Sequence, residues 1–259
     1  MKQEIKKIVI VGAGNVAWNL AKKLQVKQCY ARNLDRAKEV AIRANAQYIN
    51  DYNDLVKDAD LYIISVADNA IHEVSEQLSK HISKESIVVH TSGTMPMEVL
   101  SNKIDNIGVF YPLQTFTKGK EVSWGEIPLF VEGNSKEVEQ IIFNLAEKHS
   151  ENPIILSSEK RKEIHISAVL VCNFTNHLYA LAQKRLQKNN ISFELLKPLI
   201  RESVGKMLDY KGDISDLQTG PAIRGDNKTT NAHLALLEED SNLKEIYKTL
   251  SNSIFNGKF

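Results

Sequence analysis

The sequence has little of several features that would point to a particular class of protein. It holds two cysteines in 259 residues, Cys29 and Cys172, with no CxxC pair, so we expect neither a disulfide scaffold nor a metal site. No run of about 18 apolar residues occurs, which argues against a membrane span. The 33 basic and 32 acidic residues leave a net charge of +1, which does not favour nucleic acid as a partner.

The remaining composition is typical of a folded globular protein. Hydrophobic residues make up 42% of the chain and charged residues 25%, and the length suffices for one large domain or two smaller ones. The charged start before residues 8–11 imitates a signal peptide, but the apolar run is too short for one. Because two distant cysteines suit a reducing compartment, we expect a cytoplasmic protein.

The first 156 residues alternate between patterns typical of strands and patterns typical of helices. The β-branched run IVIV at residues 8–11 is typical of a strand buried on both faces of a sheet. The repeated strand–helix rhythm predicts a parallel sheet with helices on both sides. The expected strands are residues 5–11, 26–31, 47–49, 60–66, 86–90, 106–111, 127–131 and 153–156, and the expected helices are residues 15–24, 34–44, 69–82 and 136–149, with short helical turns at 53–57 and after Thr94.

Beyond residue 157 the strand patterns stop. The expected helices are residues 159–188, 192–208, 229–237 and 242–254. The middle of the first helix is apolar nearly all round, as in a helix that is buried in a helical domain or a dimer interface. We therefore predict an α/β fold: a Rossmann-like, doubly wound, mainly parallel sheet in residues 1–156, followed by an all-α substrate and dimerisation domain in residues 157–259.

The clearest motif is GAGNVA at residues 12–17, a GxGxxA that follows an expected strand and opens an expected helix. In that context the motif predicts a dinucleotide site. Gly12 permits the tight turn, Gly14 lets a pyrophosphate approach the backbone, and Ala17 permits close packing of the helix on the strand. Asn15 and Val16 begin the helix, whose free N–H groups face the phosphates. A glycine-rich turn that binds nothing is the alternative.

The end of the second strand contacts the adenosine ribose in such folds, and an NAD site usually carries an acidic residue there. This chain instead has Arg32, Asn33 and Arg36. Because guanidinium groups pair well with phosphate, these residues favour NADP over NAD. Asp35 keeps NAD as an alternative, and the arginines are otherwise read as solvated charges at the start of a helix.

The ends of the later strands should form the rest of the cleft, since ligands bind at the carboxyl ends of parallel strands. Tyr111 and the residues that follow it could close the cleft, and His90 should lie near the nicotinamide. Asp68 is equally well explained as a helix cap. The residues expected to contact the cofactor here are Val66, Ala67, Ser92 and Gly93.

Polar residues interrupt the long apolar helix at His165, Asn173, Asn176 and His177. At about 100° per residue, His165 and Asn176 share one face, and Asn173 and His177 share a neighbouring one. A buried polar side chain needs a partner, and in a cleft that partner could be the substrate. Each residue is equally well explained by the helical core or a dimer interface.

One loop in the helical part combines the residue types of a binding turn. Residues 220–226 (GPAIRGD) hold two glycines, a proline, Arg224 and Asp226 directly before an expected helix. A surface turn with Asp226 as the helix cap explains the same residues. We keep Arg224 as the candidate anchor for a substrate carboxylate.

Seven segments occur in an order and spacing that resemble a bacterial family. Its members join an N-terminal Rossmann-like domain to a C-terminal helical domain of unknown function, and they are provisionally named NADP-dependent oxidoreductases. The segments are GAGNVA, YARN, ISVADNAI, HTSGT, FYPLQTF, KRKEIHISAVLVCNFTNHL and TGPAIRGD. The resemblance covers essentially the whole chain. More distantly, the layout is similar to pyrroline-5-carboxylate reductase and to the 6-phosphogluconate dehydrogenase superfamily.

In those distant relatives the helical domain forms an intimate dimer and completes the active site, so the resemblance implies a homodimer. This chain departs from the pattern at one position. Hydroxyacid dehydrogenases of that superfamily carry a catalytic lysine four residues before an asparagine on the long helix. If Asn173 is that asparagine, the lysine position holds Val169. The resemblance therefore supports cofactor binding better than alcohol oxidation.

We expect an NADP-dependent oxidoreductase that transfers hydride between NADPH and a small imine or carbonyl. His165 is the first candidate proton donor and His90 the second, while Asn173, Asn176 and Arg224 are candidates for contacting the substrate. A cofactor-binding regulatory or scaffold protein without turnover is the alternative, and the absent lysine favours it.

Overall fold

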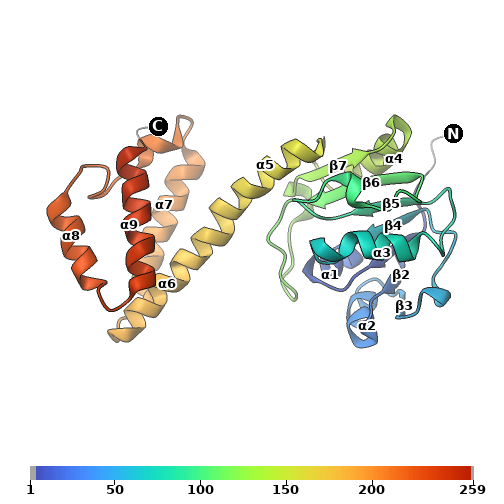
Figure 1. Cartoon of the computed structure of the whole chain (residues 1–259), viewed down its shortest axis with the longest axis horizontal. Coiled ribbons are helices and arrows are strands. Elements are labelled where there is room, and N and C mark those ends of the chain that lie inside the picture. Colours follow the sequence, from blue (N-terminus) through green and yellow to red (C-terminus); the bar gives the residue numbers. More distant parts are fainter. Residues whose placement is uncertain (1–3, 258–259) are drawn as a thin grey trace. The chain divides into compact units, whose positions relative to one another are not determined.

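The computed structural model describes residues 4–257. The chain divides into two compact units (Figure 1), a first unit that ends at Cys172 and a second unit that begins at Asn173. Helix α5 (Ser158–Ala168) thus belongs to the first unit, whereas our sequence boundary after residue 156 assigns it to the helical domain. The contacts of α5 with the sheet, described below, account for this difference.

The first unit is built on an eight-stranded sheet in the order β3-β2-β1-β4-β5-β6-β7-β8. Neighbouring strands are parallel except at the β6–β7 pair, which is antiparallel. The expected mainly parallel, doubly wound sheet is therefore confirmed. The strands are β1 (Ile8–Val11), β2 (Val26–Tyr30), β3 (Gln47–Ile49), β4 (Leu61–Ile64), β5 (Ile87–His90), β6 (Asn106–Pro112), β7 (Leu129–Gly133) and β8 (Pro153–Ile155).

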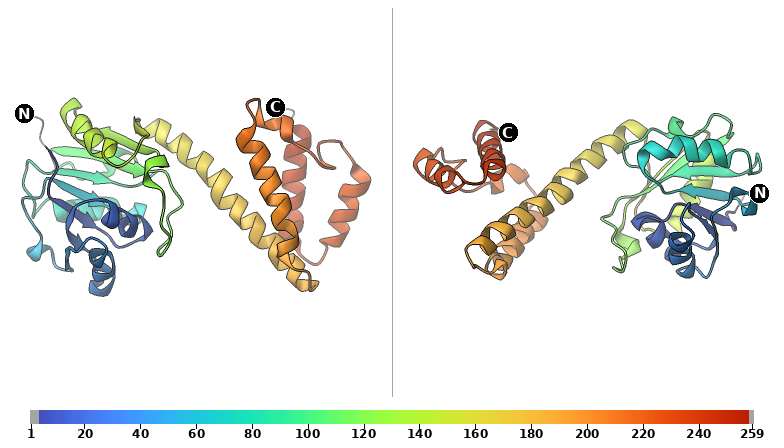
Figure 2. Two further views of the ribbon diagram at one scale, coloured as in Figure 1. Left: turned by 180° about the vertical axis from the view of Figure 1, so that it is seen from behind. Right: turned by 60° about the horizontal axis from the view of Figure 1, so that its bottom comes forward.

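Helices cover both faces of this sheet (Figures 1 and 2), and the alternation of side chains along the strands explains why. In β1, Ile8 and Ile10 pack on one face with α1, α2 and α4. Val9 and Val11 pack on the other face with α3. Every residue of β1 is buried, as its continuous β-branched run predicts. These helices are α1 (Asn15–Lys23), α2 (Leu34–Ile42), α3 (Ile71–Leu78) and α4 (Lys136–Glu147).

Two local predictions differ from the structure. The helix expected after Thr94 is only a single 3₁₀ turn, Met97–Val99, which Pro96 precedes. Asp68 does not cap a helix with its side chain but begins the 3₁₀ turn Asp68–Ala70. The residues Asp68–Ala70 line the cleft described below, whereas Met97–Val99 do not.

The long helix expected at residues 159–188 is helical throughout but is not one α-helix. Helix α5 passes into a π-helical segment, Val169–Phe174, and then into α6 (Thr175–Lys188). A π-helix has a wider turn than an α-helix, so it changes the phase of the residues that follow. Our assignment of His165 and Asn176 to one face assumed a constant 100° per residue, which the π-helical segment between the two residues does not keep.

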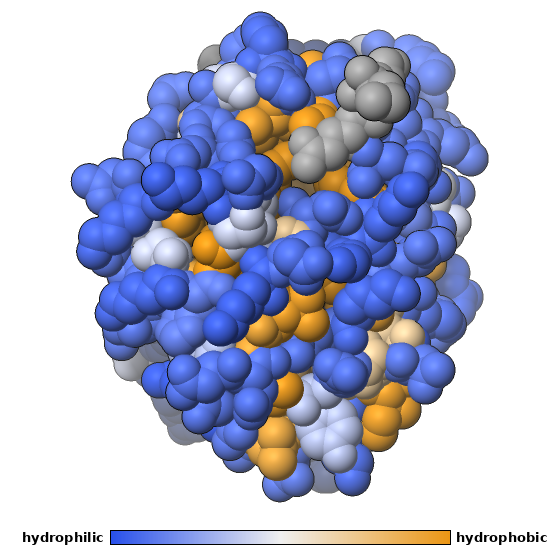
Figure 3. All heavy atoms as spheres, turned by 90° about the vertical axis from the view of Figure 1, so that its right-hand side faces the viewer, coloured by the Kyte–Doolittle hydropathy of each residue, from blue (hydrophilic) through white to orange (hydrophobic). Residues whose placement is uncertain are grey.

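The rest of the second unit is also helical, and it leaves most of its apolar side chains exposed. Among the described residues after Arg161, only the apolar side chain of Leu237 is buried. By contrast, the face of the first unit in Figure 3 carries mostly hydrophilic side chains. The further elements are the 3₁₀ segments Phe193–Leu196 and Ile214–Leu217 and the helices α7 (Lys197–Asp209), α8 (Asn227–Leu236) and α9 (Ser241–Asn256).

Candidate active site

A cleft of about 820 Å³ lies at the carboxyl ends of the parallel strands, and residues of the first unit line all of it. From the end of β2 to the end of β6 the sheet spans four strand spacings, or about 19 Å, which is an extent suited to a dinucleotide. The lining residues used below are Gly12, Gly14, Asn15, Val16, Arg32, Asn33, Arg36, Val66, Ala67, Ser92, Gly93, Tyr111 and His165.

The glycine-rich turn after β1 forms one wall of the cleft. Gly12 has φ +130°, and a Cβ there would overlap the carbonyl oxygen of Ser65 on the neighbouring strand. Gly14 precedes the first turn of α1, and a Cβ there would meet no protein atom within 4 Å. No side chain caps this helix end, so its N–H groups are available to a phosphate. The turn thus leaves room and free N–H groups for a pyrophosphate, and Ala17 is buried.

Two arginines stand at the end of β2. Arg32 and Arg36 both line the cleft, and neither forms an ion pair with another residue in 4–257. Asn33 caps α2 by accepting a hydrogen bond from the backbone N–H of Arg36 (3.0 Å). This cap places Arg36 in the first helical turn, next to the strand end. Asp35, which kept NAD as an alternative, is not among the residues that line the cleft.

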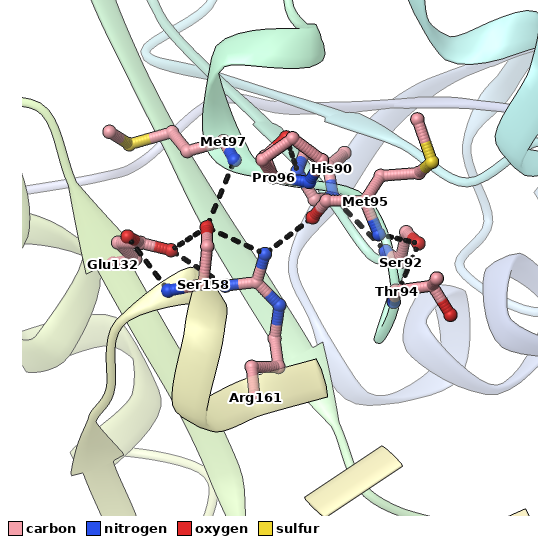
Figure 4. A network of polar contacts seen from close by, with 9 residues as sticks. All are labelled: His90, Ser92, Thr94, Met95, Pro96, Met97, Glu132, Ser158 and Arg161. Carbon is pink, nitrogen blue, oxygen red and sulfur yellow. Dashed lines mark hydrogen bonds and ion pairs between the residues drawn. The ribbon is translucent and has the colours of Figure 1, made fainter. Parts of the chain in front are cut away.

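His90 forms hydrogen bonds with the backbone of the turn after β5 (Figure 4). The backbone N–H of Ser92 donates to His90 Nδ1 (3.1 Å), so Nε2 carries the ring proton and donates to the carbonyl of Pro96 (3.2 Å). The side chain is fully buried. Burial, together with the positive charge of Arg161, lowers the pKa of His90 to about 4. The structure therefore does not bring His90 to the cleft as a proton donor, because both of its nitrogens already bond to the backbone.

Ser92 completes the fixed turn. Its hydroxyl oxygen accepts hydrogen bonds from the backbone N–H groups of Thr94 (3.1 Å) and Met95 (3.0 Å). With the His90 bonds, these contacts hold the backbone of residues 92–96 in one conformation (Figure 4). The turn is therefore a rigid wall of the cleft.

A buried ion pair that sequence reasoning missed joins α5 to this turn. Arg161 is fully buried, donates to Glu132 on β7 (2.6 Å) and donates to the carbonyl of Met95 (2.6 Å). The hydroxyl of Ser158 donates to the same carboxylate (2.7 Å) and accepts from the N–H of Met97 (3.1 Å). Figure 4 shows these side chains converging between the helix and the turn. A buried charge of this kind needs its partner, because an unpaired charge costs several kcal/mol.

His165 lies one helical turn after Arg161 and lines the cleft. Its Nδ1 is 2.9 Å from the hydroxyl oxygen of Tyr111, at the end of β6. Gly93 lies against both rings: a Cβ there would be 2.7 Å from Cγ of His165 and 2.9 Å from Cζ of Tyr111. The structure thus brings His165 to the Ser92–Gly93 turn, at the opposite end of the cleft from the arginines.

The other candidates from the helical part lie elsewhere. Asn173, Asn176 and Arg224 are exposed residues of the second unit and do not line the cleft of the first. Asp226 caps α8: its carboxylate accepts from the N–H (3.0 Å) and the hydroxyl (2.7 Å) of Thr229, which lowers the pKa of Asp226. The capping interpretation of this loop therefore explains Asp226.

The cleft also includes residues that our motif reading did not assign. Tyr30, Tyr52, Glu73 and Gln77 all line it, and the rings of Tyr30 and Tyr52 stack with centroids 4.2 Å apart. Tyr30 is the last residue of β2, two residues before Arg32, so its position at a strand end was a usable signal. Tyr52 carried no comparable signal, because its contact with Tyr30 is formed only when β2 and the 3₁₀ turn after β3 come together.

Within residues 4–257 no group of three histidine, cysteine, aspartate or glutamate residues is arranged to hold a metal ion. No helix in this part of the chain has the length and apolar character needed to cross a membrane. Both cysteines have free thiols; Cys29 is buried and Cys172 is exposed.

Comparisons with known proteins agree with this arrangement of a sheet unit and a helical unit. Residues 7–93 match the family described as "NADP oxidoreductase coenzyme F420-dependent". Residues 127–254 match the domain of unknown function DUF2520. A search among proteins of curated function finds no match.

Solved structures extend the comparison to the whole chain. A Bacteroides fragilis protein, provisionally named an NADP oxidoreductase, is 39% identical over 98% of both chains, with a TM-score of 0.91. A Thermotoga maritima protein is 21% identical over 95% of this chain and 96% of its own, with a TM-score of 0.70. Pyrroline carboxylate reductase from Plasmodium falciparum, solved with NADP bound, is 13% identical over 98% of this chain and 99% of its own, with a TM-score of 0.60. The last two similarities show the fold alone.

The glycine-rich turn, the parallel sheet and the cleft at its carboxyl edge define a Rossmann-type oxidoreductase fold. More narrowly, the chain belongs to the family of NADP oxidoreductases that joins this fold to a DUF2520 domain. The resemblance stated from the sequence is confirmed, and so is the expectation of an NAD(P)-dependent oxidoreductase.

Proposed function

We propose that the protein uses NADPH, in preference to NADH, to reduce a small imine or carbonyl compound. One observation carries this proposal: a single cleft joins the Gly12–Gly14 turn and two unpaired arginines to a histidine with a fixed ring. The first features suit the phosphates of a dinucleotide. The histidine lines the same cleft beside the Ser92–Gly93 turn, where it would be available to give a proton to a substrate bound next to the cofactor.

Each residue has a distinct role in the proposed reaction. NADPH, when bound, supplies hydride to the carbon of the substrate double bond. The N–H groups after Gly14 hold the pyrophosphate, and Arg32 and Arg36 bind the 2′-phosphate. His165 gives a proton to the nitrogen or oxygen of the substrate. The rigid Ser92–Gly93 turn excludes water from one side of the reacting atoms.

Three residues of the second unit remain predictions. Asn173 and Asn176 are proposed to bind the substrate, and Arg224 is proposed to pair with a substrate carboxylate. All three are exposed in the single chain, so their polar groups are free to bind a small anion. Their contribution is tested by substituting each with alanine and comparing KM for acidic and neutral substrates.

The proposed function is tested by titrating the protein with NADPH and then measuring NADPH oxidation with a panel of cyclic imines and α-keto acids. Tight binding and turnover of one member is the expected result. Tight binding without turnover of any member would favour the alternative, a regulatory or scaffold protein. Absence of NADPH binding would overturn both.

We also propose a homodimer formed through the second unit. Leu195, Leu199 and Leu208, on or next to α7, are 71%, 63% and 69% exposed. Helices of this kind are stabilised mainly by burying an apolar face, but among the described residues of this unit only the apolar side chain of Leu237 is buried. A second copy of the chain would cover these exposed apolar side chains.

The free thiols support the proposed cytoplasmic location, where a reducing environment keeps cysteines unpaired.

A further inference from the structure

We propose that Tyr111 is the positioning residue that holds His165 in the orientation required to donate its proton. This inference rests on the proposed function and deepens it. Tyr111 ends β6, His165 belongs to α5, and the two are 54 residues apart in the chain. The bond between the hydroxyl of Tyr111 and Nδ1 of His165 is 2.9 Å long.

This bond divides the two ring nitrogens of His165 between two roles. Nδ1 is engaged by Tyr111, whereas Nε2 has no hydrogen-bond partner among the described residues. Because the imidazole itself lines the cleft, Nε2 is the nitrogen left for a bound substrate. A histidine held through one nitrogen presents the other in a defined direction.

The surrounding contacts leave the ring little freedom to turn. Gly93 lies under both rings and has space for no Cβ. The ring of Tyr111 packs on Phe130 with centroids 6.1 Å apart and meets the His165 ring edge-on at 6.0 Å. One helical turn before His165, the buried Arg161 fixes the helix to β7 and to the turn after β5. Contacts from the turn after β5, from β7 and from α5 therefore hold the Tyr111–His165 pair in place.

Tyr111 itself keeps its proton. Burial raises the pKa of the Tyr111 hydroxyl; Arg161 opposes that rise and Asp68 adds to it. A neutral phenol accepts a hydrogen bond from Nδ1–H when the imidazole ring is positively charged. The Nε2 proton would then pass to the nitrogen or oxygen of the substrate, while the Nδ1 proton stays on the ring, so no tyrosinate forms.

The first test requires no turnover. Nitrogen-15 NMR of the histidine rings is recorded for the unmodified protein and for Tyr111→Phe, with His165→Gln used to assign the His165 signals. Tyr111→Phe keeps the ring that packs on Phe130 and removes only the hydroxyl. The Nδ1 signal should move and the Nε2 signal should move less. The matched control, Tyr48→Phe on β3 and outside the cleft, should move neither. An unchanged Nδ1 signal in Tyr111→Phe would overturn the pairing.

The second test is a double-mutant cycle with NADPH and two probes, 1-pyrroline as the imine and pyruvate as the keto acid. Tyr111→Phe should lower kcat about tenfold and leave the dissociation constant of NADPH unchanged. In the His165→Gln background the same change should cost less than about twofold, because Tyr111 acts through His165. Independent losses in the two backgrounds would overturn the proposal. Absence of turnover in the unmodified protein would count against the proposed function instead, and the NMR result would then decide the pairing.

Discussion

At the scale of single residues, cofactor choice depends on the guanidinium of Arg32. Arg32→Ala should remove most of the preference for NADPH over NADH, since a hydrogen bond to a charged group contributes about 1.5–3 kcal/mol, or roughly tenfold or more in the dissociation constant. Lys38→Ala removes a positive charge from helix α2, which follows Arg32 in the chain, but at a position outside the cleft, so it should leave the preference intact. Fluorescence titration measures both. Equal affinities for NADPH and NADH in the unmodified protein would contradict the assignment.

Two glycines of one turn should respond differently to substitution. The valine side chain of Gly14→Val would meet no protein atom and would fill the space in which the pyrophosphate approaches the backbone. This variant should therefore lose NADPH binding, while its melting temperature stays that of the unmodified protein. Gly12→Ala must overlap the backbone of Ser65 at φ +130°, so it should destabilise the fold by at least about 2 kcal/mol. Calorimetric titration and thermal melting separate the two effects. A folded Gly14→Val variant that binds NADPH normally would place the cofactor elsewhere.

The residues that sequence reasoning found at the site share a local signal. Gly12 and Gly14 directly follow the first strand, and Arg32 follows the second. Ligands bind at such strand ends, so the position of these residues relative to the strands indicates their role. Arg161 has no such signal, because it occurs among other charges in the segment KRKE and becomes distinct only when Glu132, 29 residues earlier, lies beside it. Tyr111 was identified as a residue that could close the cleft, but its bond to His165 depends on two elements meeting in space.

At the scale of an element, the turn after β5 should make stability depend on pH. His90 has a folded pKa of about 4 against a usual value of 6.5, so the unfolded chain takes up a proton before the folded chain does. The contribution of neutral His90 to the free energy of unfolding is fully present above pH 6.5. As the pH falls toward 4, this contribution decreases by at most about 3 kcal/mol. His90→Gln removes this titration. Its unfolding free energy should therefore fall less between pH 6.5 and 4 than that of the unmodified protein, measured by urea denaturation. Equal losses in the two proteins would contradict this account of the turn.

The elements themselves were predictable to different degrees. The central strands β1, β4 and β5 are short, fully buried runs made up mainly of apolar residues, so these strands and the mainly parallel sheet could be predicted from the sequence. The π-helical segment Val169–Phe174 did not. Its residues are apolar on nearly every side of the helix. Because such a segment has no polar stripe, its sequence does not show where the number of residues per turn changes.

At the scale of the whole molecule, the exposed apolar residues of the second unit predict the state of assembly. The unmodified protein should be a dimer by light scattering at micromolar concentration, because a second copy is needed to cover residues such as Leu195 and Leu199. The double variant Leu195→Asp/Leu199→Asp places two charges in that surface. Burying them costs far more than a leucine contact contributes, so the variant should be monomeric and its second unit less stable. Leu34→Asp, at a 42% exposed leucine of α2 in the first unit, should stay dimeric. A monomer in the unmodified protein would overturn the proposed dimer. A dimer that survives the double substitution but dissociates with Leu34→Asp would move the interface to the first unit.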